Sequence, residues 1–322
     1  MRSLTQNDLN QIFKNKVEIK GNFINLNSNS CFENQQHTNE VFTEKWNEFE
    51  ANDDKQKLYE FQKLWYLKLY GFNNEEELAT FLCSKDVILD AGCGLGYKAA
   101  WFAELAPDSL VLAMDFSEAS EIAATNYTHI PNLLFVRGDI ANTNLNDACI
   151  DYVSCDQVIM HTEDPTATFS EFCRIANTDT GEIACYFYAK KALPRELLDE
   201  FFRTKCKELS SQELWDMSQK LTKLGKDLTE LDIEIDIPDI PQLGIKGGKQ
   251  DLQRFIYWNF IKCFWNPDLG HATSVSVNFD WYSPSNALRF NKEEVFKLVN
   301  DNGLSIIHFH TEEAAYSGRF AK

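Results

Sequence analysis

The sequence has too few basic residues to balance its acidic ones. It contains 31 Lys and Arg against 49 Asp and Glu, which gives a formal net charge of −18 at pH 7. Binding to DNA, RNA or anionic lipid without sequence preference rests on many contacts between Lys or Arg and phosphate. The charge balance therefore argues against nucleic acid as a partner. No apolar run approaches the length of a membrane-spanning helix, so membrane insertion is not expected.

Paired cysteines are also missing. None of the nine cysteines has a second one at Cys-x-x-Cys spacing, and no histidine cluster accompanies them, so no metal site is predicted. Their odd number and their position inside apolar runs are typical of reduced, buried thiols. Residues 1–13 lack the apolar stretch of a secretion signal. These absences predict a protein of the cytoplasm.

The apolar residues of the chain follow an alternation of strands and helices. Strands are expected at 87–91, 109–114, 133–137, 151–155, 182–188 and 304–310, and helices at 96–106, 117–126, 165–177 and 292–301. Strands that are apolar throughout and separated by helices predict a parallel sheet with both faces covered. We therefore expect the α/β class, with a doubly wound, Rossmann-like and mostly parallel sheet.

Changes in composition divide the chain into four segments. Residues 1–56 are polar and rich in Asn and are expected to form an N-terminal arm, whereas residues 57–190 carry the Rossmann-like core. Residues 191–286 break the alternation and predict a helical, aromatic-rich insertion, here named the cap. Residues 287–322 are expected to complete the core with a helix and strands. The aromatic density of residues 251–265 permits a homo-oligomer but does not demand one.

Two local patterns in these segments predict helices. Phe42, Trp46 and Phe49 would share one face of a short helix in the arm, which either packs on the protein or forms a lid over a ligand. In the cap, Ser210 is expected to begin a helix as part of a capping box, and Gly225 is expected to end it.

A glycine-rich turn follows the first strand of the core. In "VILDAGCGLG", Gly92, Gly94 and Gly96 occupy alternate positions directly after an apolar strand. Glycine loses the most entropy on folding, so this density points to close approach of the backbone to a ligand. In a doubly wound sheet, ligands bind beyond the carboxyl ends of the strands, where the turn meets a helix N-terminus. The spacing differs from the Gly-x-Gly-x-x-Gly pattern of dinucleotide binding.

Acidic residues end the next two strands. Asp115 follows the second strand, where a carboxylate can accept hydrogen bonds from both ribose hydroxyls or can cap a helix at Ser117. Asp139, in "GDI", ends a third strand and would receive an adenine amino group, with Ile140 packing on the ring, or would serve only as a turn residue. The order of the glycines, Asp115 and Asp139 along the chain favours adenosine binding for both acids.

Taken in order, "VILDAGCGLG", "AMDFS", "GDI" and "DQVIMHTEDP" resemble the motifs of class I S-adenosylmethionine-dependent methyltransferases. The resemblance covers residues 87–190 together with the last helix and strand. More narrowly, the chain resembles a bacterial branch of that family, which has a Trp-bearing N-terminal segment ("KWNEF"), a helical cap insertion and a DWxSP element ("FDWYSP").

The resemblance implies S-adenosyl-L-methionine as the cofactor and assigns its contacts residue by residue. The implied positions are Asp90, Gly92 and Gly94 around the methionine portion, Gly96 at the start of the helix, Asp115 on the ribose, Phe116 and Ile140 beside adenine, Asp139 on the adenine amino group, and Gln157 near the methyl end. Backbone N–H groups and the helix dipole would favour the carboxylate of the methionine portion.

The expected activity is methyl transfer to a hydroxyl or amine of a small or medium-sized acceptor, such as a sugar, a lipid-linked compound or a secondary metabolite. His161 is the first candidate for the base, because an imidazole titrates near neutral pH. Relatives often have two histidines where this chain has Met160 and His161. Asp280 and His271 are weaker candidates for the base.

Other interpretations stay open from the sequence. Aromatic residues of the cap line the site or pack in its core; these are Trp258, Trp281 and Tyr282. An NAD-dependent oxidoreductase would share the glycine turn and the acid after the second strand, although the glycine spacing and "GDI" disfavour it. A non-catalytic partner or scaffold that binds S-adenosylmethionine would explain the Asn-rich arm and the lack of an obvious base.

Overall fold

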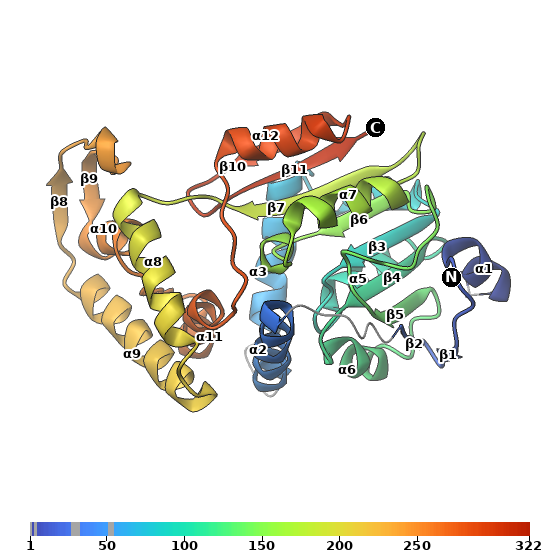
Figure 1. Cartoon of the computed structure of the whole chain (residues 1–322), viewed down its shortest axis with the longest axis horizontal. Helices are drawn as coiled ribbons and strands as arrows, with labels where there is room; N and C mark the ends of the chain where they lie inside the picture. Colours follow the sequence, from blue (N-terminus) through green and yellow to red (C-terminus); the bar gives the residue numbers. More distant parts are fainter. Residues whose placement is uncertain (1, 3–4, 27–32, 51–54) are drawn as a thin grey trace.

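A nine-stranded sheet lies at the centre of the computed structural model, which describes residues 2, 5–26, 33–50 and 55–322 (Figure 1). The strands of this sheet are β1 (Ile19–Lys20), β2 (Phe23–Asn25), β3 (Val87–Ala91), β4 (Leu110–Asp115), β5 (Leu133–Arg137), β6 (Tyr152–Cys155), β7 (Glu182–Tyr188), β10 (Ser305–Thr311) and β11 (Ala315–Ala321). Their order across the sheet is β1-β2-β5-β4-β3-β6-β7-β11-β10.

Most neighbouring strands of this sheet run parallel. The pairs that join β2, β5, β4, β3, β6 and β7 are all parallel, whereas β1, β11 and β10 pair antiparallel at the two edges. The chain order reverses between β3 and β6, and a doubly wound sheet opens a crevice for a ligand at such a point. The prediction of a doubly wound, mostly parallel α/β sheet is confirmed.

Helices cover both faces of the sheet. One face carries α3 (Lys55–Tyr70), α4 (Glu75–Cys83), α5 (Tyr97–Leu105) and α6 (Ala119–Asn126), and the other carries α1 (Gln6–Ile12), α7 (Pro165–Ile175) and α12 (Lys292–Asp301). Strand β4 shows why the sheet is buried on both sides. Its Leu110 and Leu112 pack toward α7, its Val111 and Ala113 pack toward α5, and none of these four side chains is exposed.

The predicted end of one cap helix is wrong. Ser210 begins α9 (Ser211–Glu230) with the predicted capping box, but the helix continues through Gly225. A Cβ atom at residue 225 would lie 2.2 Å from the carbonyl oxygen of Cys263. Gly225 is therefore needed for close packing of α9 against the chain at Cys263, and it does not end the helix.

The N-terminal segment contributes a strand to the sheet and a helix beside the cap. Strand β2 pairs in parallel with β5, so part of the segment expected as an arm extends the edge of the core. The helix expected around Trp46 is α2 (Glu33–Glu50), which lies between the sheet and the cap (Figure 1). The side chain of Phe49 lies outside the described part of the chain. The division into four segments stays a prediction.

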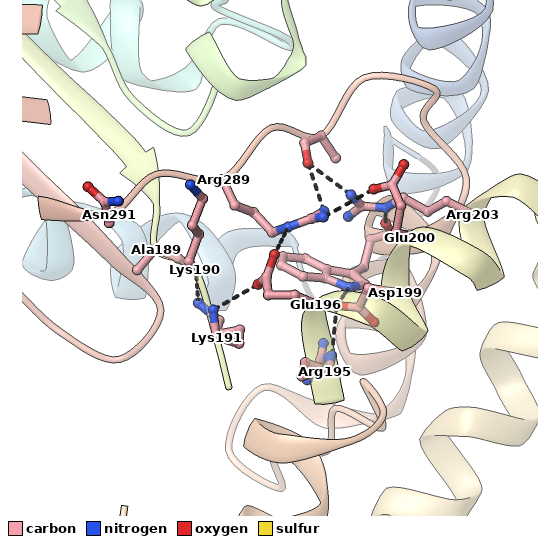
Figure 2. Close-up of polar contacts among 12 residues, drawn as sticks. Ala189, Lys190, Lys191, Arg195, Glu196, Asp199, Glu200, Arg203, Arg289 and Asn291 are labelled. Carbon is pink, nitrogen blue, oxygen red and sulfur yellow. Dashed lines mark hydrogen bonds and ion pairs between the residues drawn. The ribbon is translucent and has the colours of Figure 1, made fainter. Parts of the chain in front are cut away.

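The cap lies beside the sheet (Figure 1). It contains α8 (Leu193–Cys206), α9, β8 (Glu234–Ile237), the short 3-10 helix η2 (Pro241–Leu243), β9 (Gly248–Asp251), α10 (Leu252–Asn259) and α11 (Gly270–Tyr282). The buried carboxylate of Asp199 joins α8 to α11. It accepts hydrogen bonds from Arg195 Nε at 2.7 Å, Trp281 Nε1 at 2.9 Å and the Tyr282 hydroxyl at 3.0 Å. Figure 2 shows Arg195 and Asp199 beside the Glu196–Arg289 ion pair.

The cysteines in the described part of the chain are free, and all of them except Cys83 and Cys149 are buried. No group of three or more His, Cys, Asp or Glu side chains in the described ranges could hold a metal ion. None of the described helices combines the length and the apolar character that crossing a lipid bilayer requires.

Candidate functional site

A pocket opens at the carboxyl ends of the central strands, and α2 forms its opposite wall. Among the predicted cofactor contacts and the first candidate for the base, seven residues line it: Gly92, Asp115, Phe116, Asp139, Ile140, Gln157 and His161. They come from the ends of β3, β4 and β5 and from the segment that follows β6. The sequence therefore identified side chains that are far apart along the chain and meet in one place.

Asp90, Gly94 and Gly96 do not line this pocket. Asp90 is fully buried beneath its wall, where it forms an ion pair with Lys98 Nζ at 3.0 Å. Burial raises the pKa of Asp90, and the charge of Lys98 opposes that rise. Asp90 contacts a lysine that does line the pocket, and its contact with the methionine portion stays a prediction.

Each glycine of the turn has a positive φ and admits a different neighbour. The φ angles of Gly92, Gly94 and Gly96 are 82°, 50° and 77°. A Cβ atom at Gly94 would lie 2.9 Å from the ring of Trp46 on α2, and one at Gly96 would lie 2.5 Å from the ring of Phe135. Because L side chains rarely adopt this backbone region, the turn requires glycine for its conformation as well as for its packing. Gly96 also begins α5, as predicted from the sequence.

Asp115 holds the turn together from the end of β4. One carboxylate oxygen accepts the Gly94 N–H at 2.8 Å, and the other accepts the N–H of Ser117 at 2.8 Å and its hydroxyl at 2.5 Å. Burial raises the pKa of Asp115, and these hydrogen bonds oppose the rise. Ser117 does not cap the helix, since α6 begins at Ala119 with Glu118 in the N-cap position. Asp115 thus stabilises the turn while it faces the pocket.

Asp139 presents an unused acceptor to the same pocket. Its Oδ1 accepts the N–H of Ala141 at 2.8 Å, and its Oδ2 has no hydrogen-bond partner among the described residues. Burial raises the pKa of this carboxyl group. Ile140 beside it is buried, with 6% of its surface exposed. This pairing of a free acceptor with an apolar side chain suits the edge and the face of an adenine ring.

His161 lines the pocket from the 3-10 helix η1 (Ile159–His161), and its ring lies between two aromatic rings. The rings of Phe42 and Tyr188 have centroids 4.9 and 5.6 Å from the imidazole. Nδ1 lies 2.7 Å from the carbonyl oxygen of Asn286. A carbonyl oxygen only accepts, so Nδ1 carries the proton and Nε2 carries a lone pair. Burial lowers the pKa of His161 to about 4, so the ring is neutral at pH 7.

Asn286 was not identified from the sequence. Its backbone N–H donates to Thr38 Oγ1 on α2 at 3.1 Å, and its side-chain amide donates to Glu163 at 3.0 Å. These contacts fix the carbonyl group that orients His161. No sequence signal marks such a residue, because any amino acid has a backbone carbonyl.

The weaker candidates for the base fit less well. Asp280 lines the pocket but forms an ion pair with Lys45 of α2 at 2.6 Å. His271 is exposed at the start of α11 and is not among the lining residues. The three cap aromatics do not line the pocket either, and Trp281 and Tyr282 are bound to Asp199 instead. The aromatic rings of the pocket wall are those of Phe42, Trp46, Tyr97, Phe116 and Tyr188.

The chain is similar to one protein family and to a curated bacterial protein. The family model described as "Methyltransferase domain" matches residues 82–254. A curated protein of Mycolicibacterium smegmatis, described as "Probable S-adenosylmethionine-dependent methyltransferase", is 34% identical over 93 residues, which are 29% of this chain and 35% of the relative. The chain therefore spans about a third of the length of that curated relative.

Solved structures with similar folds include two bacterial proteins. The magnesium protoporphyrin IX methyltransferase of Synechocystis with bound S-adenosylmethionine is 13% identical, with a TM-score of 0.47, and the match covers 92% of this chain and all of that one. The YcgJ protein of Bacillus subtilis is 15% identical, with a TM-score of 0.40 and coverage of 72% and 70%.

The family match covers more than half of the chain and includes the glycine turn, Asp115, Asp139 and His161. The narrower resemblance to one bacterial branch stays a prediction. The broader resemblance, to class I S-adenosylmethionine-dependent methyltransferases, is confirmed at the level of the family: the chain belongs to the methyltransferase-domain family.

Proposed function

We propose that the protein transfers a methyl group from S-adenosylmethionine to a hydroxyl or amine of a small or medium-sized acceptor, such as a sugar, a lipid-linked compound or a secondary metabolite. The observation that carries this proposal is the arrangement of one pocket. The carboxylates of Asp115 and Asp139, which lie at or just beyond the ends of β4 and β5, line the same pocket as the neutral imidazole of His161, which follows β6.

The residues of the pocket fit the chemistry of the cofactor. Asp115 would accept hydrogen bonds from the ribose hydroxyls, and Asp139 Oδ2 would accept one from the adenine amino group. Phe116 and Ile140 would contact the faces of the ring, and Gln157 would lie near the methyl end. S-adenosylmethionine, when bound, supplies an activated methyl group and a sulfide leaving group.

His161 would remove the proton of the acceptor. Its Nε2 carries the lone pair that a base needs, and the Asn286 carbonyl accepts the hydrogen bond of the opposite nitrogen. That carbonyl would also stabilise the imidazolium formed when the proton is taken up. The rings of Phe42 and Tyr188 would exclude water and attract a positive charge nearby.

Helix α2 would act as the lid of this pocket. Lys45 joins it to the cap through Asp280, Thr38 joins it to the segment that holds His161, and Trp46 packs against the glycine turn. Among the described residues, α2 thus contacts the cap, the loop beside the base and the core. This supports the lid interpretation of its aromatic face and the proposal of a buried reaction site.

A methyl-transfer assay tests the proposed function. The protein is incubated with S-adenosylmethionine that carries an isotopically labelled methyl group and with acceptors of each class, and labelled product and S-adenosylhomocysteine are measured by mass spectrometry. Release of S-adenosylhomocysteine that depends on a hydroxyl or amine acceptor is expected. Tight cofactor binding without transfer to any acceptor class would favour the non-catalytic scaffold.

The buried His161 also predicts a pH dependence of stability. The folded protein holds its pKa at about 4, whereas an unfolded histidine titrates near pH 6.5. The unfolded state therefore binds more protons, so the free energy of unfolding is unaffected by this group above about pH 6.5 and falls as the pH decreases toward 4, by about 3 kcal/mol. Replacement by glutamine should remove this part of the dependence.

Urea unfolding of the wild type and His161→Gln at pH 7 and pH 4.5 measures the effect. The exposed His129, replaced in the same way, serves as the control. The wild type and His129→Gln should lose stability between the two pH values more steeply than His161→Gln. Equal losses in all three proteins would show that His161 is not held neutral by burial.

A further inference from the structure

The cap buries more positive charge than negative charge beside the pocket. The charged groups of three cations lie within 5.3 Å of the centroid of the Trp281 ring: Arg195, Arg203 and Lys262. These three residues are between 1% and 7% exposed, so water screens their charges little. Arg195 is neutralised by the buried carboxylate of Asp199. Arg203 and Lys262 form no ion pair with a carboxylate in the described part of the chain.

These two cations also have unused donors. Arg203 donates to two backbone carbonyl oxygens at 2.9 and 2.8 Å, and its Nη2 atom has no hydrogen-bond partner among the described residues. The ammonium group of Lys262 lies over the ring of Trp281 and donates no hydrogen bond to any described residue. Burial lowers the pKa of Lys262 to about 7, and the charge of Asp280 opposes that fall. A buried cation without a partner is unfavourable until an anion compensates its charge.

Asp280 connects this positive charge to the pocket. It directly precedes Trp281 in the chain, lines the pocket and forms the 2.6 Å ion pair with Lys45 of α2. The ring of Trp281 also lies 5.2 Å from the ring of Tyr188, which lines the pocket as well. Because Lys45 already neutralises Asp280, this carboxylate does not balance the two unpaired cations behind it. The part of the pocket beside the cap therefore carries an excess of positive charge.

Lys45 presents free donors to this part of the pocket. It lines the pocket, and its side chain is 13% exposed. An ammonium group has three N–H donors, and the bond to Asp280 is the only hydrogen bond that this one forms among the described residues. The centroid of the Phe42 ring lies 5.5 Å from Lys45 Nζ and 4.9 Å from the centroid of the His161 imidazole. The free donors and the proposed base are therefore both beside Phe42, within reach of one small molecule.

We propose that the methyl acceptor carries an anionic carboxylate or phosphate group, which Lys45 binds beside His161. The inference rests on the proposed function and deepens it, because it names the class of acceptor. The anion accepts the free N–H groups of Lys45 in charge-assisted hydrogen bonds, and its charge offsets the excess from the cap. Lys262 acts as a positioning residue. Its charge compensates Asp280 when Lys45 shares its own charge between Asp280 and the anion.

Calorimetric binding of two matched pairs of probes to the protein saturated with S-adenosylhomocysteine tests the assignment. The pairs are benzoate with benzamide and phenyl phosphate with phenol, so each anion has a neutral counterpart. They are titrated into the wild type, Lys45→Met, Lys262→Met and the control Lys223→Met, which changes an exposed lysine of the cap. Methionine keeps an unbranched apolar side chain and removes the charge.

In at least one pair, the wild type and Lys223→Met should bind the anion about 10- to 100-fold more tightly than its neutral counterpart, as expected for a charge-assisted hydrogen bond. The pair with the larger difference identifies the group as carboxylate or phosphate. Lys45→Met should lose most of the difference and Lys262→Met about half of it on a logarithmic scale. All four proteins should bind S-adenosylhomocysteine with equal affinity, which shows that the fold and the cofactor site are intact.

A wild type that prefers the anion in neither pair, or that binds none of the four probes, would overturn the assignment while leaving the proposed function in place. A preference that persists in Lys45→Met would also overturn it, because the anion would then bind elsewhere. A wild type that does not bind S-adenosylhomocysteine would contradict the proposed function itself.

Discussion

Replacement of Asp199 by alanine is expected to lower the free energy of unfolding by about 3–5 kcal/mol, the usual effect of removing one member of a buried ion pair. Asp199 is fully buried, and Arg195 beside it is 1% exposed. The substitution would leave the guanidinium group without a counterion and would remove the acceptor for both Trp281 and Tyr282. The substitution should therefore weaken the contact between α8 and α11.

Urea unfolding monitored by tryptophan fluorescence measures this effect. Asp227→Ala is the matched control, because Asp227 forms an exposed pair with Lys223 on a cap helix and should cost less than about 1 kcal/mol. The double variant Arg195→Met/Asp199→Leu should recover part of the lost stability, since no buried charge is left unpaired. Equal midpoints for Asp199→Ala and Asp227→Ala would mean that the buried network does not hold the cap together.

Replacement of His161 by alanine is expected to lower kcat by about 100-fold or more, the range of general-base catalysis. The lone pair of Nε2 is lost, and neither Asp280, which is paired with Lys45, nor the exposed His271 can replace it. The affinity for S-adenosylhomocysteine should be unchanged, because Asp115 and Asp139 remain in place. Added imidazole should restore part of the rate.

Steady-state kinetics with the identified acceptor, together with calorimetric binding of S-adenosylhomocysteine, separate the two quantities. His129→Ala, which changes an exposed histidine, should behave as the wild type does. A kcat in His161→Ala that equals that of the wild type would remove His161 from the mechanism and leave a purely positional role for it.

The core and the position of Asp115 and Asp139 in the pocket could be predicted from the sequence because their signals are local. Continuous apolar strands predicted the parallel sheet. Three glycines at alternate positions predicted the turn, and all three have positive φ angles in the structure. Asp115 and Asp139 could be located because one is the last residue of β4 and the other lies two residues beyond β5, and the carboxyl ends of parallel strands meet at one edge of a sheet. For residues at strand ends, the position along the chain therefore indicates the position in the folded protein.

The remaining parts depend on packing between distant segments. In the sequence Lys98 is an ordinary helix residue, and only the fold places it between Asp90 and Asp156. Gly225 has the typical signature of a helix end, but the approach of Cys263 is what requires a glycine. Strand β2 is only three residues long and carries no periodicity, so its place at the edge of the sheet was not foreseen.

The most direct test is native mass spectrometry of the freshly purified protein, followed by denaturation to identify any released compound. Release of S-adenosylmethionine or S-adenosylhomocysteine, or a matching mass increase when either is added, is the predicted result. Asp115→Ala should abolish that increase. Release of NAD, or a wild-type protein that stays empty and takes up no added S-adenosylmethionine, would contradict methyl transfer from this pocket.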